Sequence, residues 1–427
     1  MCSNRRTRSR KRGVRARSRF AFVLIFSLIL TCGALARAEA PQPTASFRTV
    51  SDSTNDFGFR LLRTIVRSRS GDNVIVSPLS VSLALSIAYN GAAGETKSAI
   101  AKTLGISALS DDELNRGNRD LVNTIELADP SVKMDIANAL WAQSGFAINP
   151  DFLKLARDWY DAPVESLDFV RNPEHAADVI NAWVDKNTHG KIAKIIERAK
   201  KTDRLIITDA VYFKGEWALQ FHKEETKPRD FHLQKGRSIK APMMSQRGEY
   251  PYFENDDFQA IRLPYGNKRF SVYVFLPRKN DGLSNFLTSL DEKHWKEWTD
   301  RLSNREGTIV LPKLESSWGM SLNEALKSMG MTIAFDKSKA DFSGIHPPDP
   351  WRLYVGDVEQ KTYVKVDEEG TEAAAVTSVE MAVAAIVIAK PPPFEMIVDH
   401  PFFCAITERD SGALLFAGVV MNPTRRD

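Results

Sequence analysis

The segment from Val366 to Pro393 constrains what this chain can fold into more than any other part of the sequence. It contains Gly370, continues with many small residues and ends in three consecutive prolines. Read with the two-residue period of a β-strand, one of its faces is small and uncharged. That face holds Thr371, Ala373, Ala375, Thr377 and Val379. The other face holds both acids of this stretch and consists of Glu372, Ala374, Val376, Ser378 and Glu380.

This pattern indicates a strand that can bury one side in a crowded place, such as the space between two strands that are already paired. Gly370 leaves the backbone free to change conformation near the start of the segment. An Ala-rich helix and an ordinary core strand are the alternatives, because alanine has the highest helix propensity. From this segment alone, all three interpretations stay open.

The first 38 residues differ in composition from the rest of the chain. They contain ten Lys and Arg and no acid, and an uncharged run from Phe20 to Cys32 follows the basic part. Ala36-Arg37-Ala38 then has small residues where a signal-peptide cleavage site requires them. We expect residues 1–38 to be a secretory signal peptide and the protein to be extracellular or periplasmic. An uncleaved signal anchor is the alternative because the basic part is long, although a membrane span needs roughly 20 apolar residues.

The net charge and the cysteine count both depend on this leader. The full chain has 58 Lys and Arg against 54 Asp and Glu, a net charge of +4. Without residues 1–38, 48 basic residues stand against the same 54 acids, which gives −6. The basic character therefore does not predict nucleic-acid binding. Two of the three cysteines also lie in the leader, so Cys404 has no partner for an internal disulfide.

Beyond the leader, we expect a short flexible segment over residues 39–52 and a single domain over residues 53–423. No linker, charge block or repeat divides that domain. Helical patterns crowd its first half and strand patterns its second half, which predicts an α+β fold rather than alternating βαβ units. The expected strands are short and rich in β-branched or aromatic residues. They are Val74–Val76, Leu205–Phe213, Phe270–Leu276, Thr308–Leu311, Tyr363–Val366, Met396–Val398 and Ala413–Val420.

Three helices are indicated by their end signals. Ser77 followed by Pro78 predicts a helix start, with the serine as N-cap. Ser321 and Glu324 have the spacing of a capping box, and the helix they begin is expected to end at Gly330. A third helix is expected over residues 178–186.

No catalytic motif supports an enzyme. The sequence lacks the G-x-S-x-G elbow, the H-E-x-x-H metal site, the G-x-x-x-x-G-K-[ST] phosphate loop and a CxxC pair. Its seven histidines are scattered singly, which disfavours a metal centre. We therefore predict no catalytic residue, no metal and no cofactor.

Six motifs together resemble the serpin family, in order and over about residues 53–423. The hinge, Glu368-Glu369-Gly370-Thr371-Glu372-Ala373-Ala374-Ala375, is similar to the family's hinge at every position. The other five are residues 73–80 (NVIVSPLS), 181–192 (NAWVDKNTHGKI), 213–217 (FKGEW), 399–402 (DHPF) and 416–423 (FAGVVMNP).

The resemblance implies three β-sheets with a large sheet A, eight to nine helices and an exposed reactive-centre loop at about residues 368–393. It also implies an inhibitor that acts as a suicide substrate. In the family, a serine protease cuts the loop and forms an acyl-enzyme, and the freed hinge then enters sheet A as a new strand. The hinge residues expected to matter are Glu368, Gly370, Thr371, Glu372, Ala373, Ala374, Ala375 and Thr377.

The small apolar residues around the expected reactive bond predict an elastase-like or subtilisin-like serine protease as partner. A trypsin-like target is disfavoured because the nearby base, Lys390, is followed by Pro391. The family register places the reactive bond at Ala384–Ala385, with Val383–Ala384 and Met381–Ala382 as alternatives.

The resemblance also implies two supporting clusters. The breach, where the loop enters sheet A, is expected at Trp217, Lys313 and Glu368, with a salt bridge between the last two. The shutter is expected at Asn73, Ser77, Ser80, Asp209 and Gln360. Asp209 and Gln360 depart from the family's Asn and His. Because a Gln amide can donate to a carboxylate, we expect the pair in altered form, and the pH sensitivity that a His would give is in doubt.

A non-inhibitory serpin, acting as a binding protein or chaperone, is the alternative function. Bulky or charged residues or prolines on the inserting face would favour it, whereas the face from Thr371 to Thr377 is small and uncharged. We expect a monomer with no nucleic-acid partner, and with no membrane partner unless the signal stays uncleaved.

Overall fold

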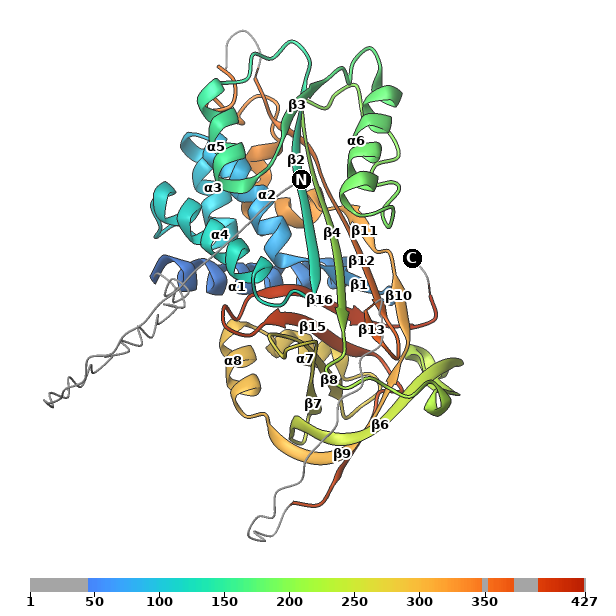
Figure 1. Cartoon of the computed structure of the whole chain (residues 1–427). Coiled ribbons are helices and arrows are strands. Elements are labelled where there is room, and N and C mark those ends of the chain that lie inside the picture. Colours follow the sequence, from blue (N-terminus) through green and yellow to red (C-terminus); the bar gives the residue numbers. More distant parts are fainter. Residues whose placement is uncertain (1–44, 348–351, 372–390, 426–427) are drawn as a thin grey trace, which may run out of the picture. The chain divides into compact units, whose positions relative to one another are not determined.

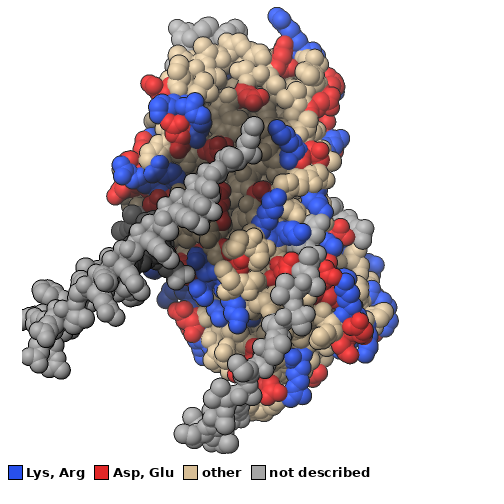
Figure 2. Space-filling view, viewed as in Figure 1, with Lys and Arg blue, Asp and Glu red and all other residues tan. Residues whose placement is uncertain are grey.

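The computed structural model describes residues 45–347, 352–371 and 391–425, which belong to one compact unit (Figure 1). The expected signal peptide, residues 1–38, lies outside the described residues. Among those described, no helix is both long and apolar enough to span a membrane. On the face shown in Figure 2, Lys and Arg alternate with Asp and Glu and do not form one extended basic surface.

Nine α-helices occur in the described part of the chain, and five of them end at or before residue 160. They are α1 (Ala45–Ser68), α2 (Pro78–Gly91), α3 (Gly94–Leu104), α4 (Asp111–Glu126), α5 (Pro150–Tyr160), α6 (Pro173–Asn187), α7 (Leu283–Ser289), α8 (Glu292–Asp300) and α9 (Asn323–Leu326).

The strands form two hydrogen-bonded networks. Their bounds are β1 (Val74–Val76), β2 (Lys133–Gln143), β3 (Val164–Leu167), β4 (Leu205–Glu216), β5 (Lys227–His232), β6 (Ser238–Glu254), β7 (Phe258–Pro264), β8 (Phe270–Pro277), β9 (Ser303–Pro312), β10 (Leu314–Ser316), β11 (Gly319–Ser321), β12 (Val355–Val366), β13 (Gly370–Thr371), β14 (Phe394–Ile397), β15 (Phe402–Glu408) and β16 (Leu414–Val420).

The smaller network is the large sheet of the prediction, in the order β10-β12-β4-β2-β3, with β11 on β12 and β13 on β4. The other network has the order β1-β16-β15-β8-β7-β6-β9-β14, with β5 on β6. The expected α+β class with a large mixed sheet is confirmed. The remaining strands join into one network because the long strand β6 pairs with β5, β7 and β9.

Strand β4 is buried on both faces, which makes it the centre of the large sheet. Its residues Ile207, Val211 and Phe213 belong to the main core, to which α2 also contributes. Its alternate residues Ile206 and Ala210 pack with the apolar side chains of α6 and of the segment that follows it. Figure 1 shows α6 and α2 on opposite sides of this sheet. Any strand added beside β4 would therefore have one face in the main core.

Two local predictions are wrong. Helix α1 already begins at Ala45, so residues 45–52 are not part of a flexible start, because Phe47 and Val50 are buried on one face of the helix. Ser321 does not form a capping box. It ends β11, and its hydroxyl donates to the carboxylate of Asp357 on β12.

The other predicted helix ends are partly confirmed. Helix α2 begins at Pro78, but the Ser77 side chain makes no cap hydrogen bond within the described residues. Gly330 interrupts its helical segment with a φ of 114°. The helix expected over residues 178–186 is α6, which is longer at its N-terminal end because Pro173 occupies its first position.

Candidate functional site

Most of the predicted site residues that the structure describes lie in or beside β4 and β12, which Figure 1 shows as neighbouring strands. The two strands run parallel and pair directly, from Leu205 with Val355 to Tyr212 with Tyr363. Beyond this stretch β12 pairs with β10 on its other side, and the end of β4 pairs with β13. The sheet is therefore closed along most of β4, and the hinge begins at the end where β4 and β12 part.

A tight turn from Asp367 to Gly370 leads the chain from β12 into β13. The Asp367 N–H donates to the Gly370 carbonyl at 2.8 Å, and Gly370 pairs antiparallel with Glu216. Gly370 has a φ of 138°, and a Cβ there would lie 2.3 Å from the carbonyl oxygen of Gly215. Any other residue would strain the backbone and collide with β4. Glycine is thus required by this close approach.

Glu368 forms the salt bridge expected at the breach. Its carboxylate accepts a hydrogen bond from the Lys313 ammonium at 2.7 Å and another from the Thr226 hydroxyl at 2.7 Å. Burial raises the pKa of Glu368, but the hydrogen bonds from Lys313 and Thr226 outweigh it, so the pKa lies below its usual value. Glu368 therefore stays ionised at neutral pH. Thr226 was not predicted from the sequence.

Trp217 holds the same turn from the β4 side. Its backbone N–H donates to the Glu369 carbonyl at 3.0 Å, and its indole N–H donates to the Asp367 carbonyl at 2.8 Å. The indole also stacks on the ring of Tyr265, with centroids 4.5 Å apart. The three predicted breach residues thus meet around the turn that begins the hinge.

Asp209 lies in the closed part of the sheet and is fully buried. Its register partners are Asn138 on β2 and Gln360 on β12, so polar residues occupy equivalent positions on three adjacent strands. One carboxylate oxygen accepts from the Gln360 amide at 2.6 Å, and the other accepts from the Ser80 hydroxyl of α2. The Gln360 amide also donates to the Ser77 carbonyl at 3.2 Å. We call these five residues the shutter cluster.

Asn138 is a member of this cluster that the sequence analysis missed. Its amide donates to the Ser80 carbonyl at 3.1 Å. Asn73, which was predicted to belong, lies elsewhere: its side chain accepts from the N–H groups of Met421 and Asn422 at 2.8 and 3.0 Å. A single polar residue within the mostly apolar run of β2 was the available signal for Asn138.

Burial raises the pKa of Asp209 to about 7, although its hydrogen bonds with Ser80 and Gln360 lower it. Among the described residues, these two hydrogen-bond partners are uncharged, so no cation compensates an ionised Asp209. In the folded protein the neutral carboxyl is therefore favoured below about pH 7. The titrating group of this cluster is thus the Asp209 carboxyl on β4, whereas in the family pattern it would be a histidine at position 360 on β12.

Most of the predicted hinge and the predicted reactive bond belong to the segment that the structure does not describe. Glu372, Ala373, Ala374, Ala375, Thr377, Ala384 and Ala385 lie outside the described residues. The alternative bonds, Val383–Ala384 and Met381–Ala382, lie outside them as well.

The chain after the loop is fixed by β14, which pairs parallel with β9. Phe394 is buried there, and its ring stacks on Tyr252 with centroids 4.0 Å apart. Gly307 provides the space, since a Cβ at that position would lie 2.2 Å from the Phe394 ring. The Arg305 guanidinium also donates to the Pro392 carbonyl at 2.8 Å. The loop is thus tied at both of its ends.

A small apolar cavity of about 40 Å³ lies next to β12. Val364 and Val366 of β12 line it, together with Leu314 of β10 and Phe416 of β16. Side chains around a cavity make fewer dispersion contacts than side chains in a filled core, so the packing against this end of β12 is incomplete. Cys404 also lines the cavity, and burial raises the pKa of its thiol to about 12, which makes it unreactive at neutral pH.

The Asp209 carboxyl predicts a pH dependence of stability. Because its pKa is raised in the folded protein, the folded state retains a proton that the unfolded chain loses near the usual pKa of 3.8. This contribution to stability is full below that value and is lost as the pH rises to about 7. We expect Asp209→Asn to flatten the fall in thermal midpoint between about pH 5 and about pH 7.

The control is Asp112→Asn on α4, which removes an exposed carboxyl with a side-chain exposure of 62%. That variant should keep the wild-type pH dependence of the midpoint, measured by differential scanning calorimetry. An Asp209→Asn protein whose midpoint falls with pH as steeply as the wild type would contradict the protonation assigned to the shutter cluster.

Comparison with known proteins agrees with this geometry. A family model described as Serpin (serine protease inhibitor) matches residues 52–423. An uncharacterized serpin-like protein of Thermococcus kodakarensis is 34% identical, over 88% of this chain and 86% of that protein. Human neuroserpin is 29% identical, over 94% of this chain and 97% of that protein.

A solved structure also shares the fold. The native-state structure of the thermophilic serpin tengpin has a TM-score of 0.79 and 28% identity, covering 90% of this chain and 96% of that one. The family model matches most of the sequence, and the alignment with a relative of 34% identity covers most of both chains. This chain therefore belongs to the serpin family of serine protease inhibitors.

Proposed function

We propose that this serpin inhibits an elastase-like or subtilisin-like serine protease as a suicide substrate, by inserting its cut loop between β4 and β12. The observation that carries this proposal is the pairing of Gly370 and Thr371 with Glu216 and Gly215. The start of the hinge is already an antiparallel neighbour of β4. Further insertion only has to extend this strand while β12 moves aside.

The existing register indicates which side of the inserted strand would be buried. Continuing it residue by residue along β4 brings Thr377 opposite Asp209, and Met381 opposite Leu205 at the start of the strand. Antiparallel partners share a face of the sheet. Ala373 and Ala375 would then accompany Phe213 and Val211, whose side chains lie in the main core.

Small residues suit that position because the core under β4 is already occupied. The opposite face of the inserted strand, with Glu372 and Glu380, would share the side on which α6 lies. This division agrees with the alternation in the sequence. A charged residue on the core-facing side would have to be buried without a partner, which costs several kcal/mol.

Insertion gains the hydrogen bonds of a new strand on both β4 and β12. It must first break the direct ladder between them, including the 2.6 Å hydrogen bond from Gln360 to Asp209. The two ties of the loop oppose this before cleavage, whereas a cut frees the hinge from β14. Movement of the attached protease would then disturb the alignment that its deacylation needs.

The target class rests on the sequence around the proposed Ala384–Ala385 bond, where small apolar residues predominate. Export also remains a proposal. It rests on the signal-like residues 1–38, which would place this inhibitor among extracellular or periplasmic proteases. A monomer suffices for the mechanism, because hinge and sheet belong to one chain.

A non-inhibitory binding role is the second candidate. Human thyroxine-binding globulin, solved with thyroxine, has a TM-score of 0.81 and 27% identity, covering 89% of this chain and all of that one. The small residues of the hinge favour inhibition for this chain, because a binding protein does not need a strand that fits between β4 and β12.

Incubation with pancreatic elastase or subtilisin should give a covalent complex that survives denaturing electrophoresis. The ester persists because the inserted strand holds the protease away from its productive geometry. Mass spectrometry of the released C-terminal peptide identifies the reactive bond. Cleavage of the loop with full protease activity left would contradict inhibition, and trypsin serves as the comparison protease.

Two neighbouring alanines test the face assignment. Ala375→Arg places a charge on the core-facing side, so we expect about ten or more inhibitor molecules consumed per protease trapped. Ala374→Arg makes the same change on the other face and should stay within about twofold of the wild-type stoichiometry. Equal effects of the two substitutions on the titrated stoichiometry would show that the register proposed for the inserted strand is wrong.

A further inference from the structure

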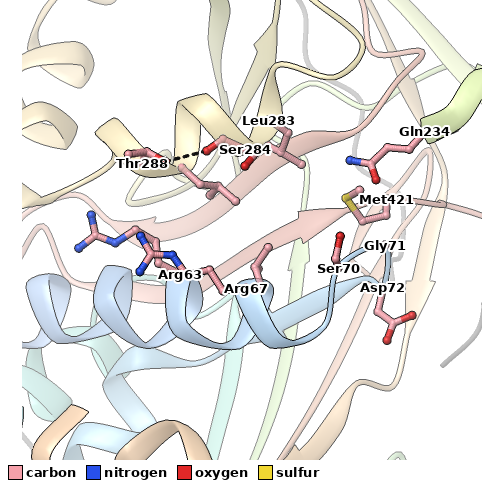
Figure 3. Close-up of a pocket in the computed structure, with 12 residues that line it drawn as sticks. Arg63, Arg67, Ser70, Gly71, Asp72, Gln234, Leu283, Ser284, Thr288 and Met421 are labelled. Carbon is pink, nitrogen blue, oxygen red and sulfur yellow. Dashed lines mark hydrogen bonds between the residues drawn. The ribbon is translucent and has the colours of Figure 1, made fainter. Parts of the chain in front are cut away.

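A surface pocket of about 290 Å³ lies at the C-terminal end of α1, and none of the described hinge residues lines it (Figure 3). Its walls come from α1 with the turn that follows it, from α7, from the β5–β6 connection and from the end of β16. Both apolar and polar side chains line the pocket. The apolar part is made of Val66, Leu283, Leu287 and Met421.

The charged groups of the pocket are distributed unevenly. Figure 3 shows the guanidinium groups of Arg63 and Arg67 toward the end near Thr288, whereas Asp72 and Gln234 lie at the other end. The carboxylate of Asp72 is already paired with Arg425 at 2.7 Å. The two arginines therefore set a positive charge at one end of an otherwise neutral pocket.

The two arginines are not equally available. Arg63 donates to the Leu290 carbonyl at 2.9 Å, which holds its guanidinium in place between α1 and the end of α7. Arg67 is exposed and has no hydrogen bond or ion pair to any residue that the structure describes. A cation in the last turn of a helix also complements the helix dipole, and this would explain the presence of Arg67 without any ligand. It does not explain the apolar surface beside it.

We propose that this pocket binds a small amphipathic carboxylate, with its anionic group on Arg67 and its apolar body against the apolar lining. Guanidinium groups bind carboxylates through paired N–H donors. The volume of about 290 Å³ lies just below the roughly 300–1,000 Å³ of small-molecule sites, so the ligand is a short-chain or single-ring acid. Such a ligand would bridge α1 and α7. This site does not depend on protease inhibition.

Octanoate is a suitable probe, and 1-octanol and inorganic sulfate separate its two parts. By saturation-transfer NMR on the full chain, we expect octanoate to bind with a dissociation constant of about 0.1–1 mM. Octanol should bind at least about fivefold more weakly because it lacks the charge. Sulfate should not displace octanoate at equal concentration, because it lacks the apolar body. Equal binding of octanol, or displacement by sulfate, would overturn the proposal.

Variants place the probe in this pocket. Arg67→Gln should weaken octanoate binding about fivefold or more, and Ser284→Trp should block it, since Ser284 is exposed and lines the pocket. Arg48→Gln removes the same charge from an exposed position on α1 that does not line the pocket, and binding should be unchanged. A thermal midpoint within about 2 °C of the wild type shows that each variant is folded. If octanoate binds Arg67→Gln and Ser284→Trp as tightly as the wild type, the inference is wrong.

Discussion

The direct pairing of β4 with β12 is the interaction on which the rest of this molecule depends. It closes the large sheet over eight residue pairs and buries both faces of β4. The same ladder occupies the place that the hinge would fill. In the proposed mechanism, this sheet gains one more strand between β4 and β12 after the loop is cut. Function in this account comes from the free-energy difference between the two arrangements.

In the proposed mechanism, two features oppose insertion before the loop is cut. At one end, the turn at Gly370 is held by Trp217 and by the salt bridge between Glu368 and Lys313, and Gly370 and Thr371 pair with the end of β4. In the middle, Asp209 joins β4 to Gln360 and to the helix below. Because no cation lies beside the buried Asp209 carboxyl among its described partners, the strength of these contacts depends on whether that carboxyl is protonated. The small cavity beside β12 adds a place where packing can improve if that strand moves.

The breach residues and the Asp209–Gln360 pair were expected from the resemblance to the serpin family, and the structure brings each set together. The alternation along the hinge was visible as a local pattern, but from Glu372 onward it lies outside the described residues. Asn138 and Thr226 were missed because their roles depend on which distant segments lie side by side in the fold, which no local pattern specifies. Asn73 was misplaced for the same reason. The helical start at Ala45 escaped because Phe47 and Val50 find their partners only in the folded core.

The central claim is that the intact chain is held short of its most stable structure until the loop is cut. The most direct test is calorimetry of the intact protein and of the same protein cleaved in the loop, under identical conditions. If the hinge inserts, the cleaved form gains a full strand and should unfold at a much higher temperature, by about 20 °C or more. A cleaved protein that unfolds at or below the temperature of the intact one would contradict the account.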